Sequence, residues 1–178
     1  LQHIINRISE EKSITSARVV EIVSEAKISY QDLLPFATFN HPLVESYGRA
    51  KVYEGDNFGV YVMSWNSGDF TAIHSHGHTQ WGTVLFFGNT NHRIYVVKDK
   101  TVKLIDDQTL RAGSLLPVRQ GFIHAMGNLS KEQFQTFHIY GADNFSSPTN
   151  DDSKVYQLEH ERIRITSGPA FLNIDDDY

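Results

Sequence analysis

The sequence predicts a mainly β protein in which a barrel, sandwich or jelly roll of antiparallel strands follows a helical N-terminal segment. Two observations carry this prediction. Apolar residues recur at helical spacing over roughly the first 36 residues. From about Arg49 onward, short β-branched and aromatic runs recur between clusters of Gly, Asn and Asp. No helical periodicity separates these runs, which favours antiparallel hairpins over β-α-β units.

The N-terminal segment should form amphipathic helices. The apolar stripes consist of Ile4, Ile5 and Ile8, and of Val19, Val20, Ile22, Val23 and Ala26. Thr15 and Ser16 are capping candidates for the second helix. Ser29-Tyr30-Gln31-Asp32 has the pattern of a capping box, so it should open a short helix that Pro35 ends.

The β region contains four strong strand candidates. They are Phe58–Trp65, Trp81–Phe87, Arg93–Val97 and Phe134–Tyr140. Residues 154–158 are a candidate for a further strand, residues 146–152 read as a polar loop, and residues 175–177 as a solvated end. With 178 residues the chain has the size of one domain, in which residues 1–45 pack as helices on a barrel and residues 46–178 form the barrel and a C-terminal extension.

Composition excludes several classes of function. The net charge of -5, without a Lys/Arg-rich run, gives no electrostatic footprint for nucleic acid. The absence of Cys excludes disulfides, thiolate zinc sites and cysteine nucleophiles, so any metal must bind to His or carboxylates. No stretch has the roughly 20 apolar residues that span a bilayer. We expect a cytoplasmic protein, a monomer or weak homodimer, that binds neither nucleic acid nor membrane.

A histidine cluster carries the strongest chemical signal. His74 and His76 lie two residues apart in the segment Gly68–His78, and on a strand such residues point to the same face. If that face is the inside of a barrel, a third imidazole from an antiparallel neighbour would complete a set of metal ligands, and His124 is the candidate. An isolated pair of this kind more often consists of exposed residues, or of hydrogen-bonded residues in the core.

The spacing around this pair resembles the first motif of the cupin superfamily. That motif runs from Gly through five residues to His-x-His and on to a later Gly, and Gly68, His74, His76 and Gly88 match it. Trp81 occupies the position of the motif's Glu, so the acidic ligand of many cupins is absent. The resemblance implies a double-stranded β-helix, or jelly-roll barrel.

A second cupin motif is matched around the third histidine. It ends in Gly, two residues, His, three residues and Asn, which Gly121, His124 and Asn128 reproduce, with Gly113 eight residues before Gly121. The proline of the motif is displaced to Pro117.

Within the cupins, three His without Glu is the pattern of the cysteine dioxygenase family, the thiol dioxygenases. Trp65 lies nine residues before His74, as in that family. Its Ser-x-His-x-Tyr appears here as Thr136-Phe137-His138-Ile139-Tyr140, whose three polar residues share one strand face and could form a hydrogen-bonded relay. The family's Tyr-x-Arg, which holds the substrate carboxylate, is similar to Tyr47-Gly48-Arg49.

The chain departs from the family at two positions. Where many members carry a Cys that crosslinks to the active-site tyrosine, or a Gly, the aligned residue is Trp81, with Gly82 next. Either the alignment slips by one residue, or an indole narrows the pocket for a substrate other than free cysteine. Ser75, between the first two ligands, replaces the usual Asp, which alters how the ligands are oriented more than whether they bind metal.

The resemblance implies an Fe(II)-dependent thiol dioxygenase that converts L-cysteine, or a related thiol carboxylate such as 3-mercaptopropionate, and O2 into the sulfinic acid. The residues it assigns are His74, His76 and His124 as metal ligands, Thr136, His138 and Tyr140 as the catalytic group, and Arg49, Tyr47 and Trp81 as substrate-binding residues. The alternative is another kind of cupin, either a metal-dependent dioxygenase acting on a non-thiol substrate or a protein that binds a metal or small molecule.

The other histidines should have no part in this site. His78 has the strand parity of the ligands but lies next to a predicted turn, which places it at the pocket rim. His3, His41, His92 and His160 are expected to be surface residues.

Overall fold

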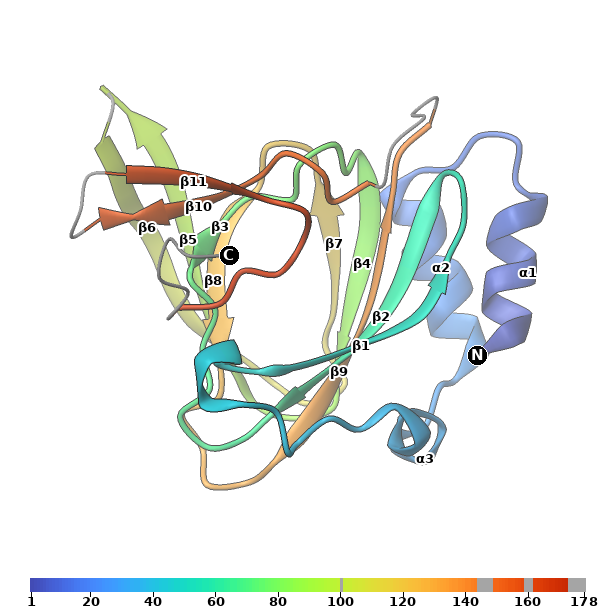
Figure 1. Cartoon of the computed structure of the whole chain (residues 1–178). Coiled ribbons are helices and arrows are strands. Elements are labelled where there is room, and N and C mark those ends of the chain that lie inside the picture. Colours follow the sequence, from blue (N-terminus) through green and yellow to red (C-terminus); the bar gives the residue numbers. More distant parts are fainter. Residues whose placement is uncertain (100, 144–148, 159–161, 173–178) are drawn as a thin grey trace.

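Two antiparallel sheets face each other in the computed structural model, which describes residues 1–99, 101–143, 149–158 and 162–172 (Figure 1). The first sheet has the order β1-β2-β9-β4-β7 and the second β11-β10-β3-β8-β5-β6. The strands of the first sheet are β1 (Gly48–Glu54), β2 (Phe58–Trp65), β9 (Phe134–Gly141), β4 (Trp81–Phe86) and β7 (Leu115–Arg119). Those of the second are β11 (Arg162–Thr166), β10 (Ser153–Gln157), β3 (Ile73–His74), β8 (Ile123–Gly127), β5 (Thr90–Lys98) and β6 (Thr101–Leu110).

The helices cover the outer face of the first sheet, at the right of Figure 1. They are α1 (Gln2–Glu10), α2 (Ser16–Ala26) and α3 (Tyr30–Leu33), with 3-10 turns at Leu34–Phe36 and Leu43–Glu45. Thr15 caps α2 by accepting a hydrogen bond from the Arg18 amide, and Ser29 and Asp32 form the predicted capping box. The short helix α3 ends at Leu33, before Pro35 as predicted, and a 3-10 turn at Leu34–Phe36 follows it. No helix among the described residues is long and apolar enough to cross a bilayer.

The four predicted strands are confirmed as β2, β4, β5 and β9, and the C-terminal strand candidate as β10. The long hairpin strand β6 was not predicted, because most of its residues are exposed and it lacks an apolar alternation. Of the predicted polar loop 146–152, residues 149–152 form a turn, while residues 146–148 lie outside the described residues. The predicted solvated end at 175–177 also lies outside them.

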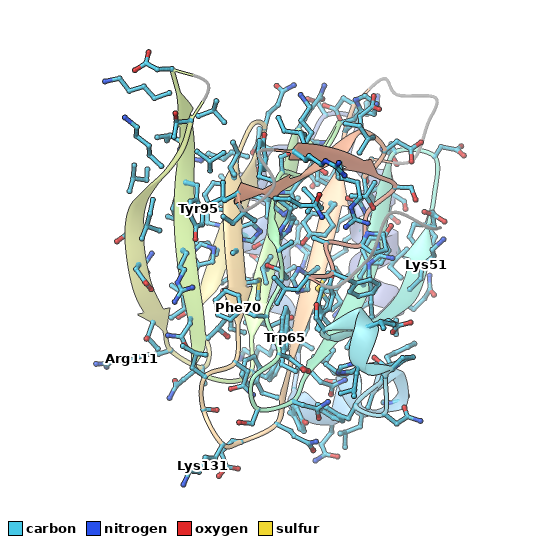
Figure 2. The ribbon with its side chains drawn as sticks, turned by 60° about the vertical axis from the view of Figure 1, so that its left-hand side comes forward. Lys51, Trp65, Phe70, Tyr95, Arg111 and Lys131 are labelled. Atoms are coloured by element: carbon cyan, nitrogen blue, oxygen red, sulfur yellow. The ribbon has the colours of Figure 1, made fainter. Side chains whose placement is uncertain are left out.

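Strand β9 divides the interior into two cores. Phe137 and Ile139 face outward, where they pack with the apolar stripes of the helices. The alternate residues face the space between the two sheets, as Tyr140 does. Figure 2 shows Trp65 enclosed among the strands, while Arg111 and Lys131 project from the surface. Because every residue of β2 and β9 is buried, these strands form a rigid wall of the inter-sheet space.

Candidate metal centre

Three imidazoles converge on the inner face of the second sheet. His74 ends β3 and pairs directly with His124 on β8, while His76 follows two residues after His74. All three side chains are buried, and one nitrogen of each lies within 4.8 Å of the others. The predicted partnership of His74, His76 and His124 is therefore present, and this triad could hold a metal ion.

The nitrogen positions fit a shared metal. The Nε2 atoms of His76 and His124 lie 3.2 Å apart, and two imidazole nitrogens bound to one metal at about 2.0 to 2.1 Å are separated by about 2.9 Å at right angles and about 3.4 Å in a tetrahedron. The Nδ1 atom of His74 lies 2.9 Å from the carbonyl oxygen of Ala72. A carbonyl only accepts, so Nδ1 carries the proton and Nε2 keeps its lone pair for a metal.

The charge state also suits metal binding. Burial lowers the pKa of His74 to about 4. Burial, and then the neighbouring imidazoles, lower the pKa of His76 and His124 well below the usual value. All three rings are therefore neutral near pH 7, which is the form that binds a metal.

A chain of four side chains lies on the inner face of the first sheet. The Trp65 indole N–H donates to Thr136 Oγ1 at 2.9 Å, Thr136 Oγ1 lies 2.6 Å from His138 Nε2, and His138 Nδ1 lies 2.7 Å from the Tyr140 hydroxyl. All four residues are buried. The predicted relay of Thr136, His138 and Tyr140 is thus joined by hydrogen bonds, and it begins at Trp65.

The direction of each hydrogen bond in this series of side chains follows if every donor has an acceptor. The indole can only donate, and no other acceptor for the Thr136 hydroxyl proton is found among the described residues, so Thr136 donates to His138 Nε2. His138 Nδ1 then carries a proton and donates to the Tyr140 oxygen. This arrangement leaves the Tyr140 hydroxyl proton available to the cavity. Burial raises the pKa of Tyr140 well above its usual value of 10, so the hydroxyl stays protonated.

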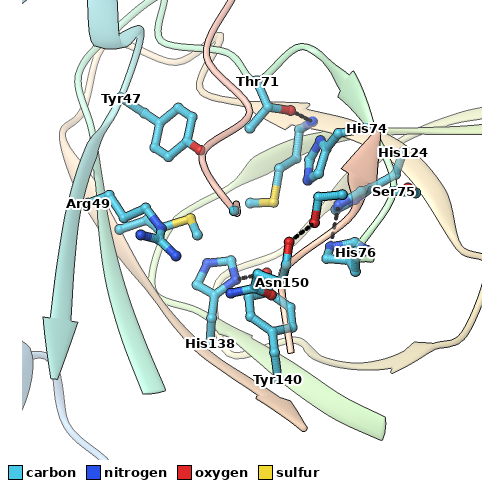
Figure 3. A pocket seen from close by; sticks show the side chains of 14 residues that line it. Tyr47, Arg49, Thr71, His74, Ser75, His76, His124, His138, Tyr140 and Asn150 are labelled. Carbon is cyan, nitrogen blue, oxygen red and sulfur yellow. Dashed lines mark hydrogen bonds between the residues drawn. The ribbon is translucent and has the colours of Figure 1, made fainter. Parts of the chain in front are cut away.

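Arg49 occupies the side of the cavity opposite the three histidines (Figure 3). Its guanidinium carbon lies 4.1 Å from the ring centroid of Tyr61, which holds the group by a cation–π contact. Its buried Nε atom has no hydrogen-bond partner, and no ion pair of Arg49 occurs within the described part of the chain. Tyr47 also lines the cavity, with its ring stacked on Trp65 and its hydroxyl oxygen bound by the Ala170 amide.

The cavity between these groups is small and electropositive. Its volume is about 20 Å³, somewhat more than the roughly 10 to 15 Å³ that one water molecule needs. Among the described residues that line it, Arg49 is the one formal cation and there is no Asp or Glu. Met63 and Met126 supply apolar walls. A divalent metal on the histidines would add further positive charge, so the site favours a small anionic molecule.

The structure corrects the substrate-binding prediction for Trp81. Its indole faces outward from β4 into the core under the helices, where it packs near Phe58 and donates a hydrogen bond to Asp143. It does not line the cavity. Gly82 pairs with Tyr140 across β4 and β9, which puts it on the inward face. The residue of β4 that lies beside Tyr140 is therefore Gly82 and not Trp81.

Two histidines expected at the surface have buried side chains. His41 Nε2 lies 2.9 Å from Asp69 Oδ2, and its side chain is 5% exposed. His92 is fully buried, with Nε2 2.8 Å from Nδ1 of His124. His3 is exposed as expected, and His78 is partly buried beside Asp152. His160 lies outside the described residues.

The C-terminal segment contributes residues that the sequence did not indicate. Asn150, Ser153 and Gly168 line the cavity beside Arg49 and the histidines. They arrive there because β10 pairs with β3, the strand that carries His74. No local pattern signals this, since the pairing joins segments that are distant in the chain.

Several solved structures are similar to this chain, although no protein-family model matches it. A protein termed TT1209 from Thermus thermophilus has a TM-score of 0.50 and 15% identity, over 65% of this chain and 97% of its own. An oxalate oxidase has a TM-score of 0.52 and 16% identity, over 67% of this chain and 63% of its own, less than two thirds of its length. An uncharacterized conserved protein with a double-stranded β-helix domain from Klebsiella pneumoniae has a TM-score of 0.45 and 20% identity, over 67% of this chain and 91% of its own. At these identities the likeness concerns the fold alone.

Proposed function

Because the chain has the cupin fold, a double-stranded β-helix with N-terminal helices, and holds three buried imidazoles inside it, we propose that it is an Fe(II)-dependent thiol dioxygenase. The substrate is L-cysteine or a related thiol carboxylate such as 3-mercaptopropionate, and the product is the sulfinic acid. The observation that carries this proposal is that two kinds of group face one cavity. Three neutral imidazoles lie on one side, and on the other lies the guanidinium of Arg49, which forms no ion pair with a described residue.

These two groups match the thiol and the carboxylate of a short thiol carboxylate. Imidazoles bind Fe(II), and three of them leave about three octahedral positions for other ligands. Arg49 offers a planar, always-charged fork that suits a carboxylate. A cavity whose described lining residues include no Asp or Glu disfavours cationic substrates that lack a carboxylate.

The reaction adds both atoms of O2 to sulfur. In R–SH + O2 → R–SO2H, two S–O bonds form and the O–O bond breaks, so atoms and electrons balance without an external reductant. Fe(II) bound to His74, His76 and His124 would supply the site at which a thiolate sulfur and O2 meet and react. The remaining steps depend on residues of this chain.

Tyr140, His138 and Thr136 act on protons and orientation. Tyr140 keeps its proton because of burial, and His138 holds its oxygen in place, so the hydroxyl donates a hydrogen bond to the polar atoms of the substrate. Arg49 and Tyr47 fix the carboxylate end. The buried walls formed by Met63 and Met126 keep water from the sulfur.

An oxygen-electrode screen of the Fe(II)-loaded protein tests this proposal. We expect O2 uptake with cysteine or 3-mercaptopropionate, and mass spectrometry after a reaction in 18O2 should find two labelled oxygens in the sulfinate. Protein loaded with Zn2+, which has no redox chemistry, is the matched control. Disulfide or peroxide as the product, in place of a doubly labelled sulfinate, would contradict the proposal.

The second candidate is a cupin that acts on a substrate without a thiol, or that only binds a metal or small molecule. The fold likeness to an oxalate oxidase makes a small carboxylic acid the relevant comparison. O2 uptake with oxalate but with no thiol would favour this candidate. Tight Fe(II) binding without O2 uptake on any of these compounds would favour a binding protein.

A further inference from the structure

His92 lies directly behind one of the three convergent histidines. It is on β5, two residues before Ile94, the residue that pairs with His124 on β8. Its side chain is fully buried, stacks on Phe122 with ring centroids 5.8 Å apart, and meets the ring of His124 edge-on at 5.0 Å. Its Nε2 atom lies 2.8 Å from Nδ1 of His124, and its own Nδ1 has no partner among the described residues.

Three imidazoles therefore form a hydrogen-bonded row. His92 Nε2 contacts His124 Nδ1, and His124 Nε2 contacts His76 Nε2. Each contact needs one proton, so two orders are possible in the metal-free row. Either His124 carries its proton on Nδ1 and donates to His92, or it carries it on Nε2 and donates to His76.

Metal binding permits only one of these two positions of the His124 proton. A metal on Nε2 of His124 uses the lone pair of that nitrogen, so the proton must be on Nδ1. Nδ1 then needs an acceptor, because burial excludes water from this position. His92 Nε2 is at hydrogen-bond distance and supplies one.

We propose that His92 is a positioning residue for the metal centre, accepting the Nδ1–H of His124 and so holding Nε2 of His124 toward the metal. This inference rests on the metal-binding part of the proposed function and not on the identity of the substrate. His92 is thereby itself held in the Nδ1–H form, and because its Nδ1 has no partner among the described residues, the bond between the metal and His124 has to offset the cost of that buried donor.

The choice of acceptor has a chemical consequence. Ligating histidines commonly donate to a carboxylate, a backbone carbonyl or water, and loss of such a partner costs about 10- to 100-fold in metal affinity. Here the partner is a neutral imidazole, which adds no negative charge behind the ligand. A bound divalent metal therefore keeps its full positive charge toward the cavity, which suits an anionic substrate.

Two substitutions separate hydrogen bonding from packing. His92→Phe keeps an aromatic ring against Phe122 but removes the acceptor, whereas His92→Gln loses the ring and places an amide oxygen near the position of Nε2. Zn2+ alone is titrated calorimetrically into metal-free wild-type, His92→Phe and His92→Gln proteins. We expect His92→Phe to weaken Zn2+ binding about 10- to 100-fold and His92→Gln to stay within a few fold of wild type.

If His92→Phe binds Zn2+ with nearly wild-type affinity and His92→Gln binds it weakly, His92 acts through packing, and the inference is overturned. If wild type binds no Zn2+, the inference falls together with the metal site. Tight wild-type binding without thiol oxidation would leave it standing while the proposed activity fails.

A second measurement needs no variant. In Zn2+-loaded wild-type protein, 15N NMR of the histidine rings should find His124 and His92 both protonated on Nδ1 and unprotonated on Nε2. A His92 ring protonated on Nε2 would mean that it cannot accept from His124, and would refute the proposal.

Discussion

The hydroxyl oxygen of Tyr140 lies 2.7 Å from Nδ1 of His138, inside the barrel and with both side chains buried. The histidine is in turn bound through Nε2 to Thr136, so its ring cannot rotate without breaking two hydrogen bonds. The tyrosine hydroxyl is thus held in a defined direction at the wall of the cavity.

Tyr140→Phe should keep the metal and lower turnover. The substitution removes one hydroxyl and leaves the ring packing almost unchanged, so the loss should appear in kcat and not in the iron content. A lost contribution to proton transfer or hydrogen bonding is typically about 10²-fold or more in rate. Tyr53→Phe, which changes a tyrosine on the outer side of the first sheet, is the control. Wild-type kcat in Tyr140→Phe would restrict the relay to a role in packing.

His138 should make the stability of the fold depend on pH. Burial, followed by the charge of Arg49, lowers the pKa of His138 to about 3. Between that value and the unfolded pKa near 6.5, the unfolded chain binds a proton that the folded chain does not, so stability falls as the pH falls through this window. The stability of His138→Gln should depend less on pH, by about 0.7 kcal/mol between pH 7 and 6 and by about 1.2 kcal/mol between pH 6 and 5. Urea unfolding of both metal-free proteins at pH 7, 6 and 5 measures the difference, and equal slopes would contradict the prediction.

Each of His74, His76 and His124 should be required for metal binding. Replacing any one with Ala removes one of three ligands, so most of the bound iron should be lost, as measured by elemental analysis of the purified protein. His3→Ala, on an exposed part of α1, should leave the iron content unchanged. Undiminished iron and activity in His74→Ala would reject the assignment.

Arg49→Ala should raise the KM for cysteine strongly and have little effect on cysteamine, which has no carboxylate. A charge-assisted hydrogen bond of this kind is worth about 1.5 to 3 kcal/mol, or roughly 10-fold to more than 100-fold in binding. General destabilisation would harm both substrates alike, so their ratio isolates the anchor. Arg93→Ala is the control, since Arg93 lies over Phe70 and pairs with Asp107 instead. Equal losses for the two substrates, with the fold intact by circular dichroism, would reject the anchor.

Substitution of Trp81 should affect the stability of the fold, whereas substitution of Gly82 should affect turnover. Trp81→Phe removes the hydrogen bond to Asp143 and part of the outer core, so it should lower the free energy of unfolding by about 1 to 2 kcal/mol and leave kcat unchanged. Gly82→Ala adds a methyl group that meets the backbone carbonyl of Ile139, so β4 must move against the strand that carries Tyr140. We expect a lower kcat there. A change of KM for cysteine in Trp81→Phe would mean that the indole affects substrate binding, which would contradict its assignment to the outer core.

The sequence by itself determined the features that depend on local periodicity and on spacing. Alternation along one strand put Thr136, His138 and Tyr140 on a single face, and the structure joins them by hydrogen bonds. The resemblance of the two motifs around His74 and His124 to those of the cupins predicted the fold, and the structure brings the three imidazoles together.

Other features depend on which strands become neighbours, and only the tertiary structure decided them. A one-residue slip reverses the faces of a strand, so the pairing of β4 with β9 had to be known before Trp81 could be assigned outward and Gly82 inward. His92 lies on a strand of mixed polarity whose burial is set by the partner strand β8, and Asn150 reaches the cavity because β10 pairs with β3. Contacts between segments distant in the chain leave no periodic signal within either one, because each side chain is buried by a surface that the other segment supplies.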